Sequence, residues 1–408
     1  MYDIVIYSFG LVLRLLAFFN PKIKKGVMGR SQTFTRLKNN INPSEKTLWF
    51  HCASLGEYEQ GLPVFKALRK DNPNHKIILS FFSPSGYEVR KNSEIADIAV
   101  YLPIDTKKHA IRFLDAINPE LSVFVKYDIW PNLLLEVKKR NLRAILISAH
   151  FRKNQVYFKS YGNYLKKVLF TFEHIFVQDE KSKKLLNSIR YKNVTVSGDT
   201  RYDRVSAQLE QNNNLDFILD FKNKSLCVVI GSSWPEDEEI LVDFINENAS
   251  KDLKFIIAPH EINSIKTNNL LSIIKLKTVL FSDMQEKNLS DYNIFIIDTV
   301  GHLSKIYNHA DIAYVGGAMG TTGLHNILEP AIFGIPIIIG KNYTKFPEAI
   351  AMIEQAGVTS IKNPLELKMV LNTLILNKEY RKKQGQLNRH YIDQNKGAIV
   401  QIMDYLRT

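Results

Sequence analysis

The chain of 408 residues carries a formal net charge of +13 and is 45% hydrophobic. It is long enough for two domains with complete cores, and its composition excludes a mainly disordered chain. The charge suits an anionic partner such as a phosphorylated substrate or an acidic membrane face, although a merely basic soluble protein has the same charge. No nucleic-acid-binding motif accompanies it, so we expect no nucleic acid partner. Cys52 and Cys227 lack metal-site spacing, which indicates a reducing compartment without a structural disulfide.

The chain begins with an apolar stretch, Ile4–Phe19, that is interrupted by Arg14 and followed by four basic residues between Lys22 and Arg30. At about 16 residues it is shorter than the ~20 residues of a spanning helix, and it lacks the features of a secretory signal. Its basic flank favours anionic lipid and keeps the body of the protein in the cytoplasm. We expect residues 1–30 to be membrane-associated, as an interfacial helix or a short anchor. A helix packed on the first domain is the alternative.

Seven apolar runs follow, and each is suited to a buried strand. They are Thr47–Ala53, Lys76–Phe82, Ile98–Leu102, Leu121–Val125, Ala144–Ser148, Ile175–Gln178 and Val194–Val196. Because helical patterns separate these runs, residues 31–207 are predicted to form a doubly wound α/β domain with a parallel sheet.

Polar side chains stand where these strands end, at the edge of the sheet where ligands bind. Glu57 follows the first strand at the mouth of a helix, where it is either a general base or a helix-capping residue. Lys126 and Asp128 follow the fourth strand. Arg201 follows the last strand, and it could bind a phosphate or carboxylate group or make a surface ion pair.

A polar stretch at residues 208–215 separates this domain from a second one, which we place at residues 216–408. The strands predicted in the second domain are Leu226–Ile230, Phe255–Ala258, Ile294–Ile297, Ile312–Val315 and Ile335–Ile339. The loops after these strands carry glycine and polar residues to one edge of the sheet. This convergence indicates a ligand-binding site more specifically than any single motif does. The last residues of the chain are predicted helices that can pack back across both domains.

The stretch Asp311–Gly340 has the order strand, glycine loop, helix, strand. Glycine allows backbone to approach a phosphate closely, and a helix N-terminus offers unpaired N–H groups. The alternative is that the glycines only form turns. We favour a binding loop because Asn326 and Glu329 are polar, and a simple turn would not require polar side chains at these positions.

Three histidines lie in the loops of the second domain: His260, His302 and His325. None has a carboxylate partner at metal-ligand spacing, so we expect hydrogen bonding rather than a metal site. No cofactor is expected either.

Several motifs together resemble one enzyme family over nearly the whole chain. They are Ala53-Ser54-Leu55-Gly56-Glu57, Trp130-Pro131-Asn132-Leu133, Gly231-Ser232-Ser233, Asp298-Thr299-Val300-Gly301 with Leu303 and Tyr307, Val315-Gly316-Gly317, and His325-Asn326 with Leu328-Glu329-Pro330. In this order they resemble the bacterial 3-deoxy-D-manno-octulosonic acid (Kdo) transferases. The resemblance implies a GT-B fold, in which two Rossmann-like domains face a cleft. It also implies inverting, metal-independent transfer of Kdo from CMP-Kdo to a lipid A precursor, lipid IVA, at the cytoplasmic face of the inner membrane.

The resemblance also assigns roles to single residues. Glu57 matches the family's catalytic base, and Arg201 stands where the family usually has a lysine thought to stabilise the transition state. Lys126 occupies the first position of the family's Glu-Thr-Glu motif and is the third catalytic candidate. The residues that match the CMP-binding loops are Pro259, His260, Val300, Gly301, His302, Asn326, Ile327, Leu328 and Glu329.

Some positions depart from the family pattern. Lys126-Tyr127-Asp128 replaces Glu-Thr-Glu, and a basic side chain cannot do the work of a carboxylate. His260-Glu261 replaces Arg-His, His302 replaces a glutamate and Leu324 a glycine. Two alternatives therefore stay open. One is another enzyme of the same architecture, such as a nucleotide-sugar epimerase or a UDP-sugar transferase, and the other is a non-catalytic lipid-binding homologue.

Overall fold

The computed structural model describes residues 2–408, which form two compact units. The first unit extends to Arg204 and also includes Lys396–Thr408, whereas the second is Val205–Asn395. The second domain was predicted to run to residue 408, with its last helices packing back across both domains. Helix α18 (Ala398–Arg407) belongs to the first unit because its Ile402 and Met403 lie in the core of that unit.

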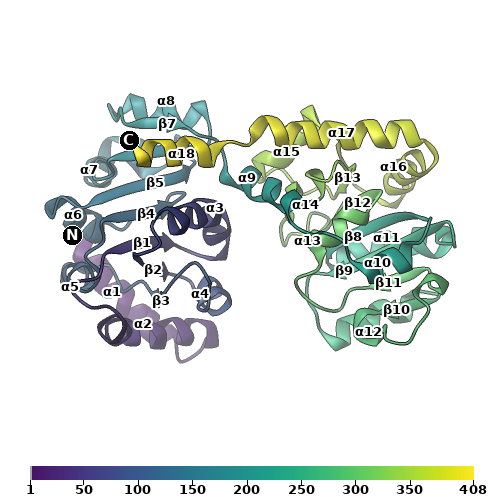
Figure 1. Ribbon diagram of the computed structural model, residues 1–408, viewed down its shortest axis with the longest axis horizontal. Coiled ribbons are helices and arrows are strands. Elements are labelled where there is room, and N and C mark those ends of the chain that lie inside the picture. Colours follow the sequence, from purple (N-terminus) through teal and green to yellow (C-terminus); the bar gives the residue numbers. More distant parts are fainter. Residues whose placement is uncertain (1) are drawn as a thin grey trace. The chain divides into compact units, whose positions relative to one another are not determined.

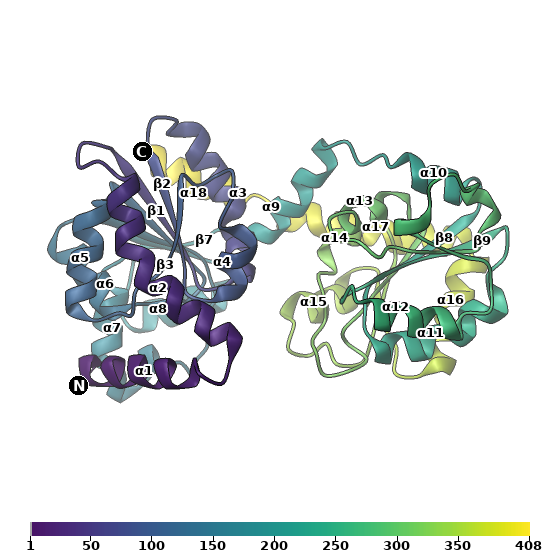
Figure 2. The ribbon, with the colours of Figure 1, turned by 90° about the horizontal axis from the view of Figure 1, so that it is seen from below.

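The first unit contains a parallel sheet of seven strands with helices on both faces (Figures 1 and 2). Its strands are β1 (Thr47–Cys52), β2 (Lys76–Phe81), β3 (Ile98–Tyr101), β4 (Leu121–Val125), β5 (Arg143–Ala149), β6 (His174–Val177) and β7 (Val194–Val196). The order across the sheet is β3-β2-β1-β4-β5-β6-β7, so all seven predicted strands of this domain are confirmed.

Both faces of this sheet are buried, as its strands of almost unbroken apolar residues require. Successive side chains of a strand point to opposite faces. Trp49 therefore packs on one side with Phe124 and Phe113, while Phe50 packs on the other side with Phe65. The helices of this unit are α1 (Tyr2–Leu16), α2 (Pro21–Asn40), α3 (Leu55–Asp71), α4 (Pro84–Arg90), α5 (Lys107–Ile117), α6 (Pro131–Lys139), α7 (Asn163–Leu169), α8 (Glu180–Ser188) and α9 (Thr200–Ser206), besides α18.

The N-terminal helices are fastened to the first unit by polar contacts. Tyr2 donates a hydrogen bond to Asp105 at 2.8 Å, and Asn132 donates one to Asp3 at 2.8 Å. The guanidinium group of Arg30, in the middle of α2, donates to the backbone carbonyls of residues 82 and 102. Both N-terminal helices therefore belong to the first unit, and residue 30 lies inside the packed helix α2.

Helix α1 nevertheless leaves most of its apolar side chains exposed, since Ile6 alone among its residues is buried. The exposed large apolar residues around it are Ile4, Val5, Tyr7, Phe9, Leu11, Val12, Leu15, Leu16, Phe18 and Phe19. In residues 2–408, none of the helices combines the length and the apolar character needed to cross a membrane.

The second unit contains another parallel sheet of seven strands. They are β8 (Leu226–Ser233), β9 (Leu253–Pro259), β10 (Thr278–Leu280), β11 (Ile294–Ile296), β12 (Ile312–Val315), β13 (Ile337–Ile339) and β14 (Val358–Ser360), in the order β10-β11-β9-β8-β12-β13-β14. The five predicted strands are present. The sequence missed β10 and β14, the two edge strands, because only one residue of each is buried and neither forms a continuous apolar run of buried residues.

Helices again cover both faces of this sheet (Figure 2). They are α10 (Asp216–Lys222), α11 (Pro235–Asn248), α12 (Ser264–Ile273), α13 (Leu303–Ile306), α14 (Leu328–Ala331), α15 (Pro347–Gln355), α16 (Pro364–Leu376) and α17 (Lys378–Asn395). The core between the sheet and α11, α12 and α16 is built from branched aliphatic residues with Phe244, Phe255 and Tyr314.

Candidate active site

The strand order of each sheet places its ligand-binding edge. In the first unit the chain proceeds outward from β1 to β3 and then returns to β4 on the other side of β1. In the second unit the same reversal occurs between β8 and β12. Ligands of open α/β sheets bind outside the carboxyl ends of the two strands that flank such a reversal. The loops after β1, β4, β8 and β12 are therefore where the candidate residues should gather.

Glu57 lies in the first turn of α3, directly after β1, and is half-buried. The hydroxyl of Ser54, the residue before the helix, donates a hydrogen bond to Oε2 of Glu57. The helix N-terminus favours the ionised carboxylate. Both interpretations from the sequence remain compatible with this geometry, because a residue bonded to the helix cap can also present its second oxygen to a substrate.

Arg201, in α9, is held by a carboxylate. Its guanidinium group donates to Asp199 at 2.8 and 2.9 Å, and Gln60 donates to the other oxygen of Asp199 at 2.8 Å. Burial by itself raises the pKa of Asp199, but the charge and hydrogen bonds of Arg201 outweigh burial and bring it below its ordinary value. Gln60 lies one turn after Glu57 on α3, so the chain around Arg201 is tied to the helix that carries Glu57.

Lys126 follows β4 with φ at 71°, a left-handed conformation that is uncommon for a residue with a side chain. Its ammonium nitrogen lies 5.7 Å from the centre of the Tyr127 ring. The turn sends Asp128 back over the end of β1, where its carboxylate meets His51 at 2.5 Å. The structure therefore brings Asp128, and not only Lys126, to the edge from which Glu57 projects.

In the second unit, the glycine loop after β12 is organised by Asp237 of α11, whose side chain is fully buried. One oxygen of Asp237 accepts hydrogen bonds from the backbone N–H groups of Gly317 and Trp234, at 2.8 and 3.0 Å. The other oxygen accepts one from the hydroxyl of Tyr314 at 2.8 Å. Gly317 has φ at 94°, which glycine adopts without strain.

Three aromatic rings meet beside this loop. The ring of Trp234 stacks on His260, with centroids 4.6 Å apart, and His260 lies 4.3 Å from His325. Trp234 donates its indole N–H to His325 Nε2 at 3.2 Å. Burial, with the neighbouring His260, lowers the pKa of His325 to about 4, and burial also lowers that of His260. Both rings are therefore neutral near pH 7 and available as hydrogen-bonding groups.

The segment after the glycine loop presents two polar side chains and two buried apolar ones. Asn326 donates a hydrogen bond to Glu329 at 3.0 Å, and both are half-buried. The side chains of Ile327 and Leu328 are buried in the core, so these two residues can offer a ligand only their backbone.

Three other predicted positions, Val300, Gly301 and His302, lie on the loop after β11. Val300 is 81% exposed and Gly301 has open space around it. The ring of His302 packs against Phe217 and Phe281, at 5.8 and 5.0 Å, instead of joining His260 and His325. The three predicted histidines do not form one group, and no cluster of His, Cys, Asp or Glu able to hold a metal occurs within residues 2–408.

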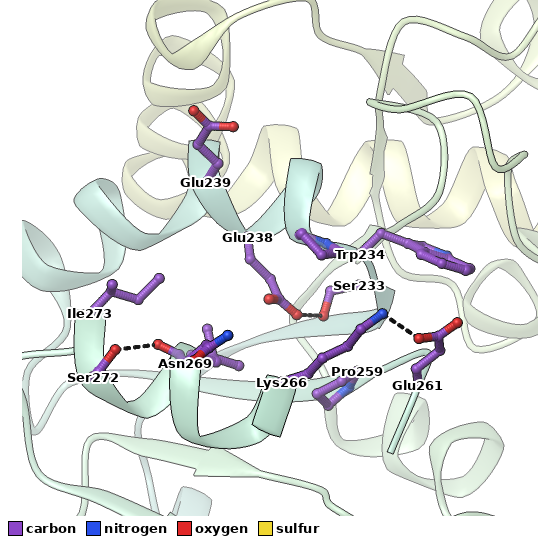
Figure 3. A pocket seen from close by; sticks show the side chains of 12 residues that line it. Ser233, Trp234, Glu238, Glu239, Pro259, Glu261, Lys266, Asn269, Ser272 and Ile273 are labelled. Atoms are coloured by element: carbon purple, nitrogen blue, oxygen red, sulfur yellow. Dashed lines mark hydrogen bonds and ion pairs between the residues drawn. The ribbon is translucent and has the colours of Figure 1, made fainter. Parts of the chain in front are cut away.

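A hollow of about 440 Å³ adjoins Pro259 at the ends of β8 and β9 (Figure 3). Helices α11 and α12 form its walls. Glu238, which accepts a hydrogen bond from Ser233 at 2.7 Å, projects into it, and Lys266 pairs with Glu261 at its rim (Figure 3). Pro259 and Trp234 both line this hollow.

Sequence reasoning missed three residues of these edges: His51, Trp234 and Asp237. His51 lies inside an apolar strand, where a buried histidine has no visible partner in the sequence. Trp234 and Asp237 belong to none of the motifs that predicted a site. The acidic residue at the third helical position, which accepts from the backbone N–H of Trp234, is a capping signal that could have identified Asp237.

Comparison with known proteins agrees with this architecture. A family model described as 3-deoxy-D-manno-octulosonic-acid transferase (kdotransferase) matches residues 28–204. The 3-deoxy-D-manno-octulosonic acid transferase of Haemophilus influenzae is 26% identical over 391 residues, which cover 90% of this chain and 87% of that protein. A bifunctional glycosyltransferase/methyltransferase of Fusobacterium nucleatum is 31% identical over 80% of this chain, which spans 51% of that protein.

Among solved structures, the UDP-GlcNAc 2-epimerase from Neisseria meningitidis matches with a TM-score of 0.63 and 15% identity, over 89% of this chain and 100% of that one. At this identity the likeness concerns the fold alone, two Rossmann-like units of the GT-B type. The sequence relatives agree with the resemblance: residues 28–204 match the family model of the 3-deoxy-D-manno-octulosonic-acid transferases, and over most of its length the chain is similar to enzymes that carry this name.

Proposed function

We propose that this protein transfers Kdo from CMP-Kdo to a lipid A precursor, lipid IVA, at the cytoplasmic face of the inner membrane. The transfer inverts the anomeric centre and uses no metal. The observation that carries the proposal is Glu57, a half-buried carboxylate held by Ser54 at the mouth of α3, in the unit that the family model matches.

In the proposed reaction, Glu57 removes a proton from a hydroxyl of the acceptor. The hydrogen bond from Ser54 occupies one carboxylate oxygen and leaves the other to take the proton. The acceptor oxygen then attacks the anomeric carbon while the bond to the CMP phosphate breaks. Arg201, whose orientation is set by Asp199, supplies positive charge for the phosphate that leaves.

The second unit is proposed to hold CMP. Glu329 accepts hydrogen bonds from the ribose hydroxyls, and the backbone of the glycine loop approaches the phosphate. The neutral rings of His260 and His325, together with Pro259, flank the nucleotide. Val300, Gly301 and His302, on the loop after β11, offer backbone and ring contacts at the same edge of the sheet.

Membrane association is proposed for helix α1. Its outer side chains are large and apolar, with Phe18 and Phe19 exposed by 84% and 86%. The basic residues that follow at the start of α2 attract anionic lipid. An interfacial helix with this pattern would bring the acceptor's unit to the lipid surface.

The decisive experiment incubates the full chain with CMP-Kdo and lipid IVA and detects the Kdo-bearing lipid by mass spectrometry, with Glu57→Gln as the matched variant. Product from the parent chain alone supports the proposal. Titration with CMP and UDP separates the main rival, since a UDP-sugar enzyme or epimerase would prefer UDP. A chain that binds lipid but forms no product under any condition would be the non-catalytic homologue.

A further inference from the structure

A chain of buried polar side chains runs beneath the ligand-binding edge of the first unit. Trp49 donates its indole N–H to Ser80 Oγ at 2.7 Å, and Ser80 Oγ lies 2.8 Å from His51 Nδ1. The other ring nitrogen of His51 lies 2.5 Å from Asp128. Trp49, His51 and Ser80 are fully buried.

The donor and acceptor of each hydrogen bond in this network follow from the hydrogen-bonding capacity of each side chain. An indole nitrogen only donates, so Ser80 Oγ accepts from Trp49. The hydroxyl of Ser80 can donate to the carbonyl of Phe50 at 3.5 Å or to His51 Nδ1 at 2.8 Å, and the shorter contact favours His51. His51 then carries its proton on Nε2 and donates it to Asp128. The indole N–H of Trp130 lies between His51 Nε2, at 2.9 Å, and this oxygen of Asp128, at 3.0 Å, so His51 and Trp130 both contact one carboxylate oxygen.

The other oxygen of Asp128 accepts no hydrogen bond from any residue between 2 and 408. Its side chain remains 19% exposed, so that oxygen faces solvent. An ionised carboxylate can accept about four hydrogen bonds, and only one oxygen is used here. One oxygen of the Asp128 carboxylate is thus held by protein side chains, and the other is available to a ligand.

The placement of this carboxylate is also specific. The left-handed turn at Lys126 directs the chain from β4 back over the end of β1, at the point where the strand order reverses. Left-handed backbone at a residue with a side chain costs about 1–2 kcal/mol, and such strain concentrates at functional sites. Glu57 starts from the end of the same strand, β1.

We propose that Asp128 is a second acceptor-binding carboxylate, whose outer oxygen accepts a hydrogen bond from a hydroxyl group of the acceptor sugar. His51 is a positioning residue that acts through Asp128. This inference rests on the proposed function and adds to it a contact for the acceptor that none of the matched motifs supplies.

The test measures acceptor binding and turnover in the full chain. Asp128→Asn should raise the acceptor KM about 10- to 100-fold, the range of a hydrogen bond to a charged group, while CMP affinity stays unchanged. His51→Leu should reproduce this loss, whereas His51→Gln, which can still donate to Asp128, should retain most of the affinity. The double variant His51→Leu/Asp128→Asn should be no worse than Asp128→Asn, because the two residues act through one contact.

His174→Leu is the control. It removes another partly buried imidazole of the same sheet, bonded to Thr195 at 2.9 Å but at the start of its strand. It should leave the acceptor KM unchanged. Normal acceptor KM in Asp128→Asn, with only a lower melting temperature, would overturn the inference and reduce Asp128 to a structural role.

Binding of a water-soluble, deacylated, diphosphorylated glucosamine disaccharide, measured by calorimetry, gives a readout without turnover. Weaker binding to Asp128→Asn than to the parent supports the inference. A parent chain that transfers Kdo but binds the disaccharide no better than Asp128→Asn overturns the inference alone. A parent chain that neither binds the disaccharide nor transfers Kdo overturns the proposed function as well.

Discussion

Replacing Asp237 by alanine should damage the glycine loop of the second unit, both in stability and in nucleotide binding. The donors that would lose their acceptor include the N–H groups of Gly317 and Trp234 and the hydroxyl of Tyr314. Gly317 and Tyr314 are buried, whereas Trp234 is only half-buried. Two buried donors left unsatisfied cost about 1–3 kcal/mol each. Burial raises the pKa of Asp237, so removing the carboxyl group also relieves some desolvation. A net loss of about 2–5 kcal/mol is expected.

Two measurements check this prediction. Urea denaturation followed by circular dichroism gives the free energy of unfolding, and hydrogen exchange over residues 316–323 reports the opening of the loop. Asp243→Ala is the matched control, because it removes an exposed carboxylate of the same helix. If Asp237→Ala unfolds within 1 kcal/mol of Asp243→Ala and its loop exchanges no faster, Asp237 does not organise the loop.

Other predictions concern catalysis, nucleotide binding, the membrane and pH. Glu57→Gln should lower turnover by about 10²–10⁴-fold without changing CMP affinity; turnover within threefold of the parent would place the base elsewhere, with Asp128 the next candidate. Glu329→Gln should weaken CMP binding by about 1.5–3 kcal/mol in calorimetry, and unchanged affinity would remove it from the site. Deleting residues 1–19, which spares α2, should release the protein from membranes in sedimentation at high salt and leave a cooperative thermal transition. Burial raises the pKa of Asp105 to about 6, despite hydrogen bonds from the backbone of Asn132 and from Tyr2. Because this folded pKa exceeds the unfolded value of about 3.9, the group stabilises the fold fully below pH 4 and its contribution is lost as pH rises through 6. The unfolding free energy of the parent should therefore fall relative to that of Asp105→Asn between pH 4 and 6.5, and parallel pH curves would refute this.

The sheets were predictable because a strand that is buried on both faces needs an apolar residue at nearly every position, which gives a continuous apolar run in the sequence. Val123 and Ile145, for example, are flanked by residues that are equally buried. The edge strand β14 lacks that signal, because only the first of its three residues is buried, so it was missed. The position of α18 was not predictable from local pattern, because its backbone is capped by Asp203 from far earlier in the chain, which accepts from the N–H of Gly397 at 2.8 Å.

For the candidate residues of the first unit, the sequence predicted the sheet edge at which they lie, because each comes shortly after a strand. These residues are Glu57, Asp128 and Arg201, and the parallel sheet brings the ends of their strands to one edge. What orients them could not be read from the sequence, because the partners come from other elements. Gln60 reaches Asp199 across 139 positions, and Tyr314 reaches Asp237 across 77.

The end of β1 controls both carboxylates of the first unit's edge. His51, inside the strand, donates to Asp128, and Ser54, just beyond it, donates to Glu57. Each bond engages one carboxylate oxygen and leaves the other for a ligand. Since residues at 51 and 54 belong to one short segment between a buried strand and a helix, any shift in the register of β1 would move both carboxylates together. The buried bonds from Trp49 through Ser80 to His51 resist such a shift, which explains why polar groups lie inside an otherwise apolar core.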